Sequence, residues 1–330
     1  MLFVALLYIL FIFAAIFAEE LESKELQPKK SEAGGLNPRI KTVAHRGASR
    51  FAPENTLAAF DLAVQQKADY IEMDVQMAKD GELVVIHDPF LNRTTSGTGR
   101  IKDFSLNEMR HLDAGSWFNE EFSEEKLPAL QEVLDRYSNK IGLLIELKDP
   151  HLYPGIERLL ANELRKRKLH LRKNHSIIVQ SFDYGSIKEF NRLLPTVPTG
   201  ILLISPPSEQ QLTEYSSNVK YINLYHGVLN HQLIKSLKSR GFKIFTWTVN
   251  ERDTYLKMTN WDIDGVITDI PRLKDGLCGA AVNPSHSSPP YYDSWSSFIL
   301  FVSELFQESI KSVHEENKYL NKKTVGCYNI

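Results

Sequence analysis

Five residues of the sequence could together perform metal-assisted hydrolysis: three carboxylic acids and two histidines. Glu72 and Asp74 are two positions apart in an apolar run, so on a strand both side chains point to one face. Glu146 ends another apolar run, at 142–146. Carboxylates that converge on one point repel each other strongly, and a bound divalent cation neutralises them. Ligands that are all oxygen favour a hard ion, Ca²⁺ or Mg²⁺, over zinc.

The two histidines, His45 and His87, each end a short apolar run. Beside a metal, two imidazoles supply what phosphodiester cleavage requires: a base for the attacking oxygen and an acid for the leaving alkoxide. Arg46 can present a two-pronged fork to a phosphate, and Lys148 offers a second cation. The plainer interpretation is that these charges are structural, with the acids on the outer face of the sheet and the cations paired with carboxylates. Because so many charged and histidine side chains lie at successive strand ends, we favour a shared site over separate structural roles.

Short apolar runs alternate with amphipathic stretches along most of the chain, which indicates the α/β class and a closed parallel (β/α)8 TIM barrel. We expect helices over 54–66, 155–168 and 229–240. Eight barrel strands are expected near residues 42–44, 70–75, 142–146, 176–180, 200–204, 221–224, 243–249 and 265–268. The carboxyl ends of such strands surround one mouth, where catalytic residues of barrel enzymes lie.

An insertion interrupts this alternation after the second barrel strand, where about sixty residues stand in place of a single helix. It spans about 83–130 and begins with a hairpin-like strand, 83–88, after the turn at Asp80 and Gly81. Polar residues at 94–99 and the pair Trp117 and Phe118 follow. A loop-rich insertion beside the mouth is well placed to shape a substrate pocket.

Both ends of the chain lie outside the barrel pattern, which covers 39–272. Residues 1–18 carry no charged side chain, as in a signal peptide or an N-terminal membrane anchor, and 19–38 form a polar linker. We expect the barrel outside the cytoplasm, released or tethered, with a cytoplasmic-side anchor as the alternative. Residues 273–330 form a tail, and an apolar stripe over 296–313 predicts one amphipathic helix. We expect this helix to pack on the barrel, with a position on a membrane surface as the alternative.

Composition excludes several classes of function. The 330 residues carry a net charge of -2, so no overall field attracts nucleic acid, and any affinity for phosphate must be local. Only Cys278 and Cys327 are present, which excludes a disulfide framework and a cysteine-based zinc site. No protein partner is indicated.

The residues described above belong to motifs that resemble those of the glycerophosphodiester phosphodiesterases. The resemblance covers about residues 42–272 and implies that Glu72, Asp74 and Glu146 bind the metal, with His45 and His87 as the acid–base pair. The motifs are, in order, HRGA (45–48), PENT (53–56), ExD (72–74), DG (80–81), HD (87–88), ExK (146–148), QSF (180–182), WTVN (247–250) and DGVITD (264–269).

The same resemblance places Arg46 and Lys148 at the phosphate. Glu54 and Asn55 lie in the PENT motif, where Asn55 either supports the site or only starts a helix. The resemblance also implies that Phe182 and Trp247, at strand ends, line the substrate pocket. The alternative for these two rings is a place in the upper core of the barrel.

The implied reaction is metal-dependent hydrolysis of a small glycerophosphodiester to sn-glycerol 3-phosphate and an alcohol such as choline or ethanolamine. Direct attack by water and initial attack by the glycerol 2-hydroxyl both remain open, as does the identity of the base. One alternative is a phosphodiesterase that acts on lysophospholipids or on polymers with a glycerophosphate backbone, which the apolar end segments favour. The other is a non-catalytic binding barrel, against which the full set of acids and histidines argues. Membrane association is expected through residues 1–18.

Overall fold

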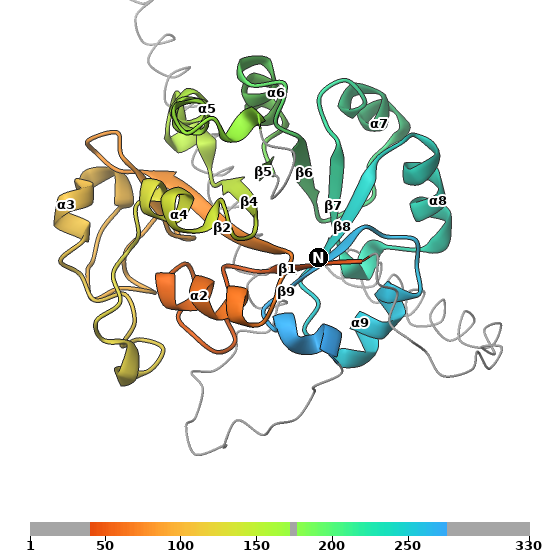
Figure 1. Ribbon diagram of the computed structural model, residues 1–330. Coiled ribbons are helices and arrows are strands. Elements are labelled where there is room, and N and C mark those ends of the chain that lie inside the picture. Colours follow the sequence, from red (N-terminus) through yellow and green to blue (C-terminus); the bar gives the residue numbers. More distant parts are fainter. Residues whose placement is uncertain (1–39, 172–176, 276–330) are drawn as a thin grey trace, which may run out of the picture.

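The computed structural model describes residues 40–171 and 177–275, which form a closed barrel of eight parallel strands surrounded by helices (Figure 1). The strands follow the order β1-β9-β8-β7-β6-β5-β4-β2, and pairing of β1 with β2 closes the ring. The fold is therefore the (β/α)8 barrel that the alternation of apolar runs predicts. The proposed signal or anchor segment, the linker and the tail helix lie outside the described residues.

The barrel strands agree closely with the apolar runs of the sequence. Their bounds are β1 (Lys41–Ala44), β2 (Tyr70–Met77), β4 (Gly142–Leu147), β5 (Ile177–Ser181), β6 (Thr199–Leu203), β7 (Tyr221–Tyr225), β8 (Lys243–Trp247) and β9 (Gly265–Thr268). The helices around them are α2 (Leu57–Gln65), α4 (Leu130–Tyr137), α5 (Ile156–Lys166), α6 (Tyr184–Leu193), α7 (Glu209–Tyr215), α8 (His231–Ser239) and α9 (Arg252–Thr259).

The inside of the barrel has an apolar floor with polar residues above it. The floor is a cluster of buried residues from six strands: Val43, Leu144, Ile178, Tyr221, Phe245 and Ile267. Side chains two positions further along a strand point the same way, so Glu146 follows Leu144 on the inner face of β4. On β2, Ile71, Met73 and Val75 pack outward into the helix layer, which leaves Glu72 and Asp74 facing inward.

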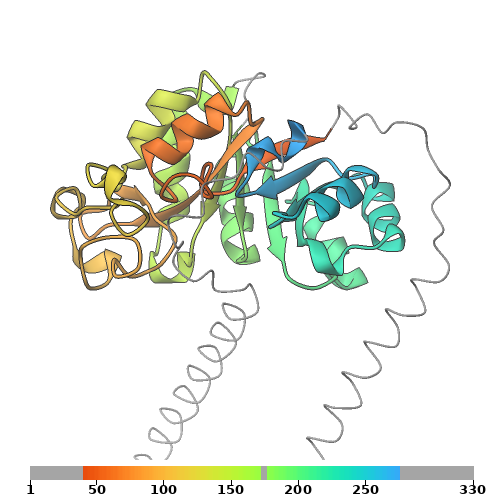
Figure 2. The same cartoon turned by 90° about the horizontal axis from the view of Figure 1, so that it is seen from below.

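The insertion after β2 has a small core of its own. Strand β3 (Leu83–Val85) runs antiparallel to the end of β2, as the turn at Asp80 and Gly81 predicts. The short helices η1 (Ile101–Asp103), α3 (Leu106–Met109) and η2 (Glu120–Phe122) follow. Figures 1 and 2 show the insertion on the side of the barrel away from α8. Its buried residues are Ala78, Val84, Ile86, Leu91, Ile101, Met109, Ala114 and Leu127.

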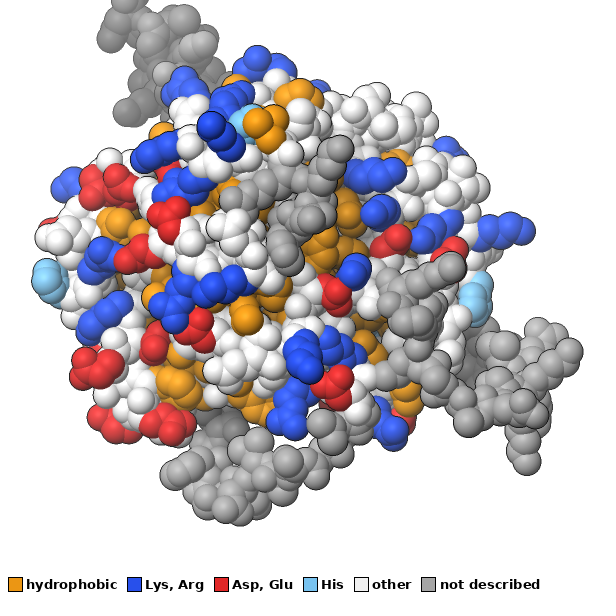
Figure 3. Space-filling view, viewed as in Figure 1, with side chains coloured by type: hydrophobic (Ala, Val, Ile, Leu, Met, Phe, Trp, Pro, Cys, Tyr) orange, Lys and Arg blue, Asp and Glu red, His pale blue; other side chains and the backbone are white. Residues whose placement is uncertain are grey.

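Basic residues gather where the outer helices end. Helices α5, α6, α8 and α9 each carry Lys or Arg in the last turn, where the negative end of the helix dipole favours a cation. Figure 3 shows Lys and Arg side chains scattered over one face of the molecule, with Asp and Glu side chains among them. Among the described residues, no helix is both long enough and apolar enough to cross a membrane.

Candidate active site

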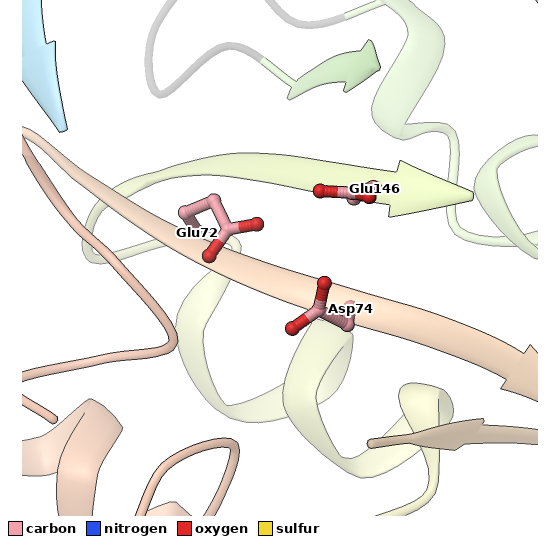
Figure 4. Close-up of side chains that lie close together, drawn as sticks. All are labelled: Glu72, Asp74 and Glu146. Atoms are coloured by element: carbon pink, nitrogen blue, oxygen red, sulfur yellow. The ribbon is translucent and has the colours of Figure 1, made fainter. Parts of the chain in front are cut away.

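Three buried carboxylates form one cluster inside the barrel (Figure 4). Glu72 and Asp74 project from β2 and Glu146 projects from the adjacent β4, where it pairs in register with Asp74. One oxygen of each carboxylate lies within 4.8 Å of the others. Their exposed fractions are 1%, 1% and 6%, respectively, so water screens their mutual repulsion poorly. The structure thus brings together the three acids that the sequence grouped.

The protonation of this cluster is uneven. Burial and the nearby charge of Asp74 raise the pKa of Glu72 to about 8. Burial also raises the pKa of Glu146, partly opposed by Lys148. For Asp74, burial is outweighed by the positive charges of His87, Arg46 and Lys148, which lower its pKa to about 2. The three acids cannot all ionise together, because their negative charges repel each other. A bound divalent cation would remove this repulsion, and the all-oxygen donors fit a hard ion.

Neutral side chains hold the carboxylates in place. The Asn55 amide donates to Asp74 Oδ2 at 2.9 Å, and its oxygen accepts from the Asp74 backbone N–H at 3.3 Å. Gln180 on β5 donates to Glu72 Oε1 at 3.4 Å and accepts from Asn223 on β7 at 2.7 Å. Such supporting hydrogen bonds fix the orientation of ligands around a metal. Asn55 is therefore a supporting residue of the site in addition to preceding helix α2.

The loop after β1 is strained at the residues that reach the site. Arg46 and Asn55 both have left-handed backbones, with φ of 56° and 58°, and strain of this kind concentrates at functional sites. The Arg46 backbone N–H donates to Glu72 Oε2 at 2.8 Å. Gly47, with φ of 84°, lies so close to α2 that a Cβ would come 2.7 Å from the Ala59 carbonyl carbon. The HRG motif thus needs its glycine for helix packing.

Two cations border the acids. Arg46 Nη1 lies 2.9 Å from Glu54 Oε1, and Arg46 Nε lies 3.4 Å from Asp74 Oδ2. Lys148 Nζ lies 3.0 Å from Glu146 Oε1 and 3.9 Å from Asp74 Oδ1. Burial opposes the charge of Lys148, but these carboxylates outweigh it and raise its pKa. Among the described residues, the buried Arg46 Nε makes no hydrogen bond, and Asp74 is the carboxylate beside it.

His45 is oriented by a carboxylate from the last strand. Its Nδ1 lies 2.7 Å from Asp269 Oδ1, and Asp269 also accepts from Asn250 at 2.6 Å and from Ser49 at 3.1 Å. Burial and the charge of Arg46 act to lower the pKa of His45. The hydrogen bond and charge of Asp269 outweigh both and raise it.

His87 is also oriented by a carboxylate, but its pKa shifts the other way. Its Nδ1 lies 2.6 Å from Asp88 Oδ1. Burial and the charges of Arg46 and Lys148 lower the pKa of His87 to about 4, so the ring is neutral near pH 7. Its backbone is held as well, because the buried Gln76 amide donates to the His87 carbonyl at 2.7 Å.

Aromatic rings form a wall beside Lys148. Phe182 directly follows β5 and Trp247 ends β8, and their rings meet edge to face with centroids 5.7 Å apart. Tyr225 lies 5.9 Å from Trp247, and Lys148 Nζ lies 5.7 Å from the centre of the Phe182 ring. Phe182 is 48% exposed, so it lies at the mouth of the barrel and not in the upper core.

Several residues of the site had no role assigned from the sequence. Asp88, Gln180 and Asp269 lie within the HD, QSF and DGVITD motifs, and their place in these motifs is the sequence signal that distinguishes them. Gln76 continues the alternation of Glu72 and Asp74 along one face of β2, which was a further signal. Arg93 and Asn223 are in no such motif, and only the folded chain brings them to the site.

The fold and the site define a (β/α)8-barrel enzyme with a buried cluster of three acids at the carboxyl ends of its strands. Residues 45–273 match the model of the glycerophosphoryl diester phosphodiesterase family, so the chain belongs to this family. The chain is 45% identical to the protein YhdW of Bacillus subtilis over 71% of its own length and 97% of that protein. A glycerophosphodiester phosphodiesterase of the same organism is 38% identical, over 74% of this chain and 88% of the relative.

A comparison with solved structures also shows similarity to a phosphodiesterase. The chain resembles a phosphodiesterase of Oleispira antarctica in complex with the product sn-glycerol-3-phosphate. The TM-score is 0.67 and the sequence identity is 32%, over 73% of this chain and 96% of the other. The likeness covers nearly all of that enzyme, so the barrel described above corresponds to a whole phosphodiesterase.

Proposed function

We propose that this enzyme hydrolyses glycerophosphodiesters to sn-glycerol 3-phosphate and an alcohol. The observation that carries the proposal is the meeting of three buried acids, two cations and two carboxylate-held histidines at one barrel mouth. The phosphodiesterase relatives support it, as does the product sn-glycerol-3-phosphate in the complex of the Oleispira antarctica enzyme.

Glu72, Asp74 and Glu146 are the residues that would hold the cation, and their oxygen donors favour Ca²⁺ or Mg²⁺. A divalent cation, when bound, polarises a phosphoryl oxygen and orients the diester. Asn55 and Gln180 keep two of the carboxylates turned toward the shared point.

Arg46 and Lys148 hold the phosphate in this proposal. Both stay positively charged, because the carboxylates around them raise their pKa values. Their charges offset the negative charge that develops on the phosphoryl oxygens during displacement. Phe182 and Trp247 form the apolar wall against which the glycerol or the alcohol lies.

The two histidines divide the proton transfers. Because Nδ1 of each ring is bound to a carboxylate, Nε2 is the nitrogen available to the substrate. His87 begins neutral and accepts the proton of the attacking oxygen, from water or from the glycerol 2-hydroxyl. His45, whose pKa the Asp269 carboxylate raises, is the partner that donates a proton to the alkoxide as the bond from phosphorus to the leaving oxygen breaks. When water attacks, one proton is taken up and one is released, so the pair returns to its starting state through exchange with solvent. When the glycerol 2-hydroxyl attacks, the first product is a cyclic phosphate, and water then opens its ring to give sn-glycerol 3-phosphate. In that second step His45 accepts the proton of water and His87 donates to the leaving 2-oxygen, which restores the starting state of both rings.

Residues 1–18 complete the proposal as a signal or anchor that places the barrel outside the cytoplasm, released or tethered to a membrane. Their lack of any charged side chain supports this role. Fractionation of cells that produce the full chain, with protease added to intact cells, tests it. Protection of the barrel from protease would instead favour an anchor on the cytoplasmic side.

The test of the reaction is incubation of the purified chain with glycerophosphocholine, glycerophosphoethanolamine and lysophosphatidylcholine. Each is supplied with Ca²⁺, with Mg²⁺ or with EDTA, and the released alcohol and phosphate ester are measured. Turnover of a glycerophosphodiester that EDTA abolishes supports the proposal. Choline released only from the lysolipid would make that lipid the substrate, a second candidate that the exposed Phe182 ring favours. Absence of turnover with every metal would refute the hydrolytic function.

A further inference from the structure

Arg93 joins two parts of the site that come from different segments. Its Nε and Nη2 donate to the two oxygens of Asp88 at 2.7 and 2.9 Å. Its Nη1 and Nη2 donate to the two oxygens of Glu54 at 2.9 and 2.8 Å. One guanidinium therefore makes a two-pronged contact with each of two carboxylates, the strongest geometry available to an arginine.

Each of those carboxylates holds a residue of the proposed reaction. Asp88 binds Nδ1 of His87 at 2.6 Å, and Glu54 binds Nη1 of Arg46 at 2.9 Å. An unbroken series of hydrogen bonds and ion pairs thus runs from the His87 ring through Asp88, Arg93 and Glu54 to the Arg46 guanidinium, with Arg93 at its centre. The Glu54 and Asp88 side chains are 13% and 28% exposed, whereas the Arg93 side chain is 43% exposed, so solvent reaches these contacts from the arginine side. The two-pronged geometry, and not burial, is what distinguishes them from an ordinary surface pair.

The backbone around Arg93 is firmly anchored in the insertion. Leu91 is buried in the insertion's core, and the Thr95 hydroxyl donates to the Leu91 carbonyl at 2.7 Å. Thr94 and Thr95 are also buried. An arginine mounted on a packed segment loses little further conformational freedom when it bridges to Glu54.

We propose that Arg93 is a positioning residue that sets the distance and angle between the His87 ring and the Arg46 guanidinium. The inference rests on the proposed function and deepens it. It gives the insertion a role in catalysis, because the insertion carries both Arg93 and Asp88, whereas Glu54 belongs to the loop after β1. Lysine cannot replace arginine here, since an ammonium group does not offer two planar pairs of donors.

The decisive variant is Arg93→Lys, which keeps the positive charge and loses the double fork. We expect kcat for glycerophosphocholine to fall about 10- to 100-fold, the scale of a misplacement of about 1 Å, while the melting temperature stays near that of the wild type. Arg100→Lys is the matched control, because Arg100 lies in the same insertion over the Phe90 ring, 5.6 Å from its centroid. Its kcat should equal that of the wild type.

A double-mutant cycle separates positioning from a merely structural role. Arg93→Lys and Asp88→Asn are measured singly and together, and positioning through Asp88 predicts that the double variant is little worse than either single one. Independent effects that multiply would overturn the proposal, as would wild-type kcat in Arg93→Lys. Failure of the wild type to turn over any diester would instead refute the proposed function itself.

Discussion

Metal affinity should rise steeply with pH because one of the proposed ligands is protonated at neutral pH. The pKa of Glu72 is raised to about 8 by burial and by the charge of Asp74. A cation that binds through Glu72 must displace its proton. The perturbation is a change of pH from about 6 to about 9 on the metal-free full chain, with Glu72→Gln as the matched variant.

The magnitude follows from the fraction of Glu72 that is ionised. With a pKa of about 8, about 1% is ionised at pH 6 and about 90% at pH 9, so Kd for Ca²⁺ or Mg²⁺ should fall about 90-fold across that range. Asp74, with a pKa of about 2, is ionised throughout and adds nothing. The raised pKa of Glu146 acts in the same direction as that of Glu72 and makes the dependence steeper.

Isothermal titration calorimetry measures both the affinity and the protons released. Titrations near pH 7 in two buffers of different ionisation enthalpy should show release of about one proton for each ion bound. In Glu72→Gln the binding should be weaker and its dependence on pH shallower. A Kd that changes less than about threefold between pH 6 and pH 9, or binding without proton release, would refute the reasoning.

The stability of the metal-free chain should change with pH in the opposite direction to metal affinity, and should fall as pH rises. Glu72 loses its proton near 4.5 in the unfolded chain and near 8 in the folded one, so the unfolded state binds fewer protons between these values. The free energy of unfolding should therefore fall as pH rises through that window and level off above it. Added cation should reverse the loss, which thermal melts with and without the ion would measure.

Three further predictions concern single residues. His45→Ala should lose most activity on glycerophosphocholine but keep its activity on a diester with a p-nitrophenol leaving group, which needs no acid. His87→Ala should lose activity on both substrates. Equal losses in the two variants on both substrates would contradict the division of roles. Asn55→Ala should weaken metal binding about 10- to 100-fold by freeing the Asp74 carboxylate, which calorimetry measures; unchanged affinity would count against a supporting role. Gln76→Leu leaves the carbonyls of Ile86 and His87 without their donor and the Tyr153 hydroxyl without its acceptor. We expect kcat to fall and chemical denaturation to show a loss of at least about 1–3 kcal/mol in stability, whereas wild-type values would show that these hydrogen bonds are dispensable.

The barrel could be predicted from the sequence because each strand and helix is signalled locally. The apolar run at 142–146 became β4 with a difference of one residue at its end. The helix expected from residue 54 begins instead at Leu57, because Asn55 adopts a left-handed backbone and Thr56 caps the helix by accepting from the Ala59 N–H. The exact start depended on the tight loop that carries Arg46, which no pattern of apolar spacing reports.

The residues that orient the histidines could not be predicted in the same way. Asp269 binds His45 across 224 positions of the chain, and Arg93 binds Glu54 across 39. Contacts of this kind depend on which strands become neighbours when the barrel closes. The sequence around an acid at a strand end does not indicate which side chain that acid will contact. The HD and DGVITD motifs marked Asp88 and Asp269 as notable without indicating their partners.

The sequence by itself determined which acids share a face, because side chains alternate with a period of two along a strand. It also determined the barrel, because the spacing of apolar residues identifies strands and helices one after another. Only the tertiary structure decided which of the acids holds a proton and why the two histidines differ. A pKa depends on burial and on distances to charges, and these arise when β2, β4 and the insertion pack around one point.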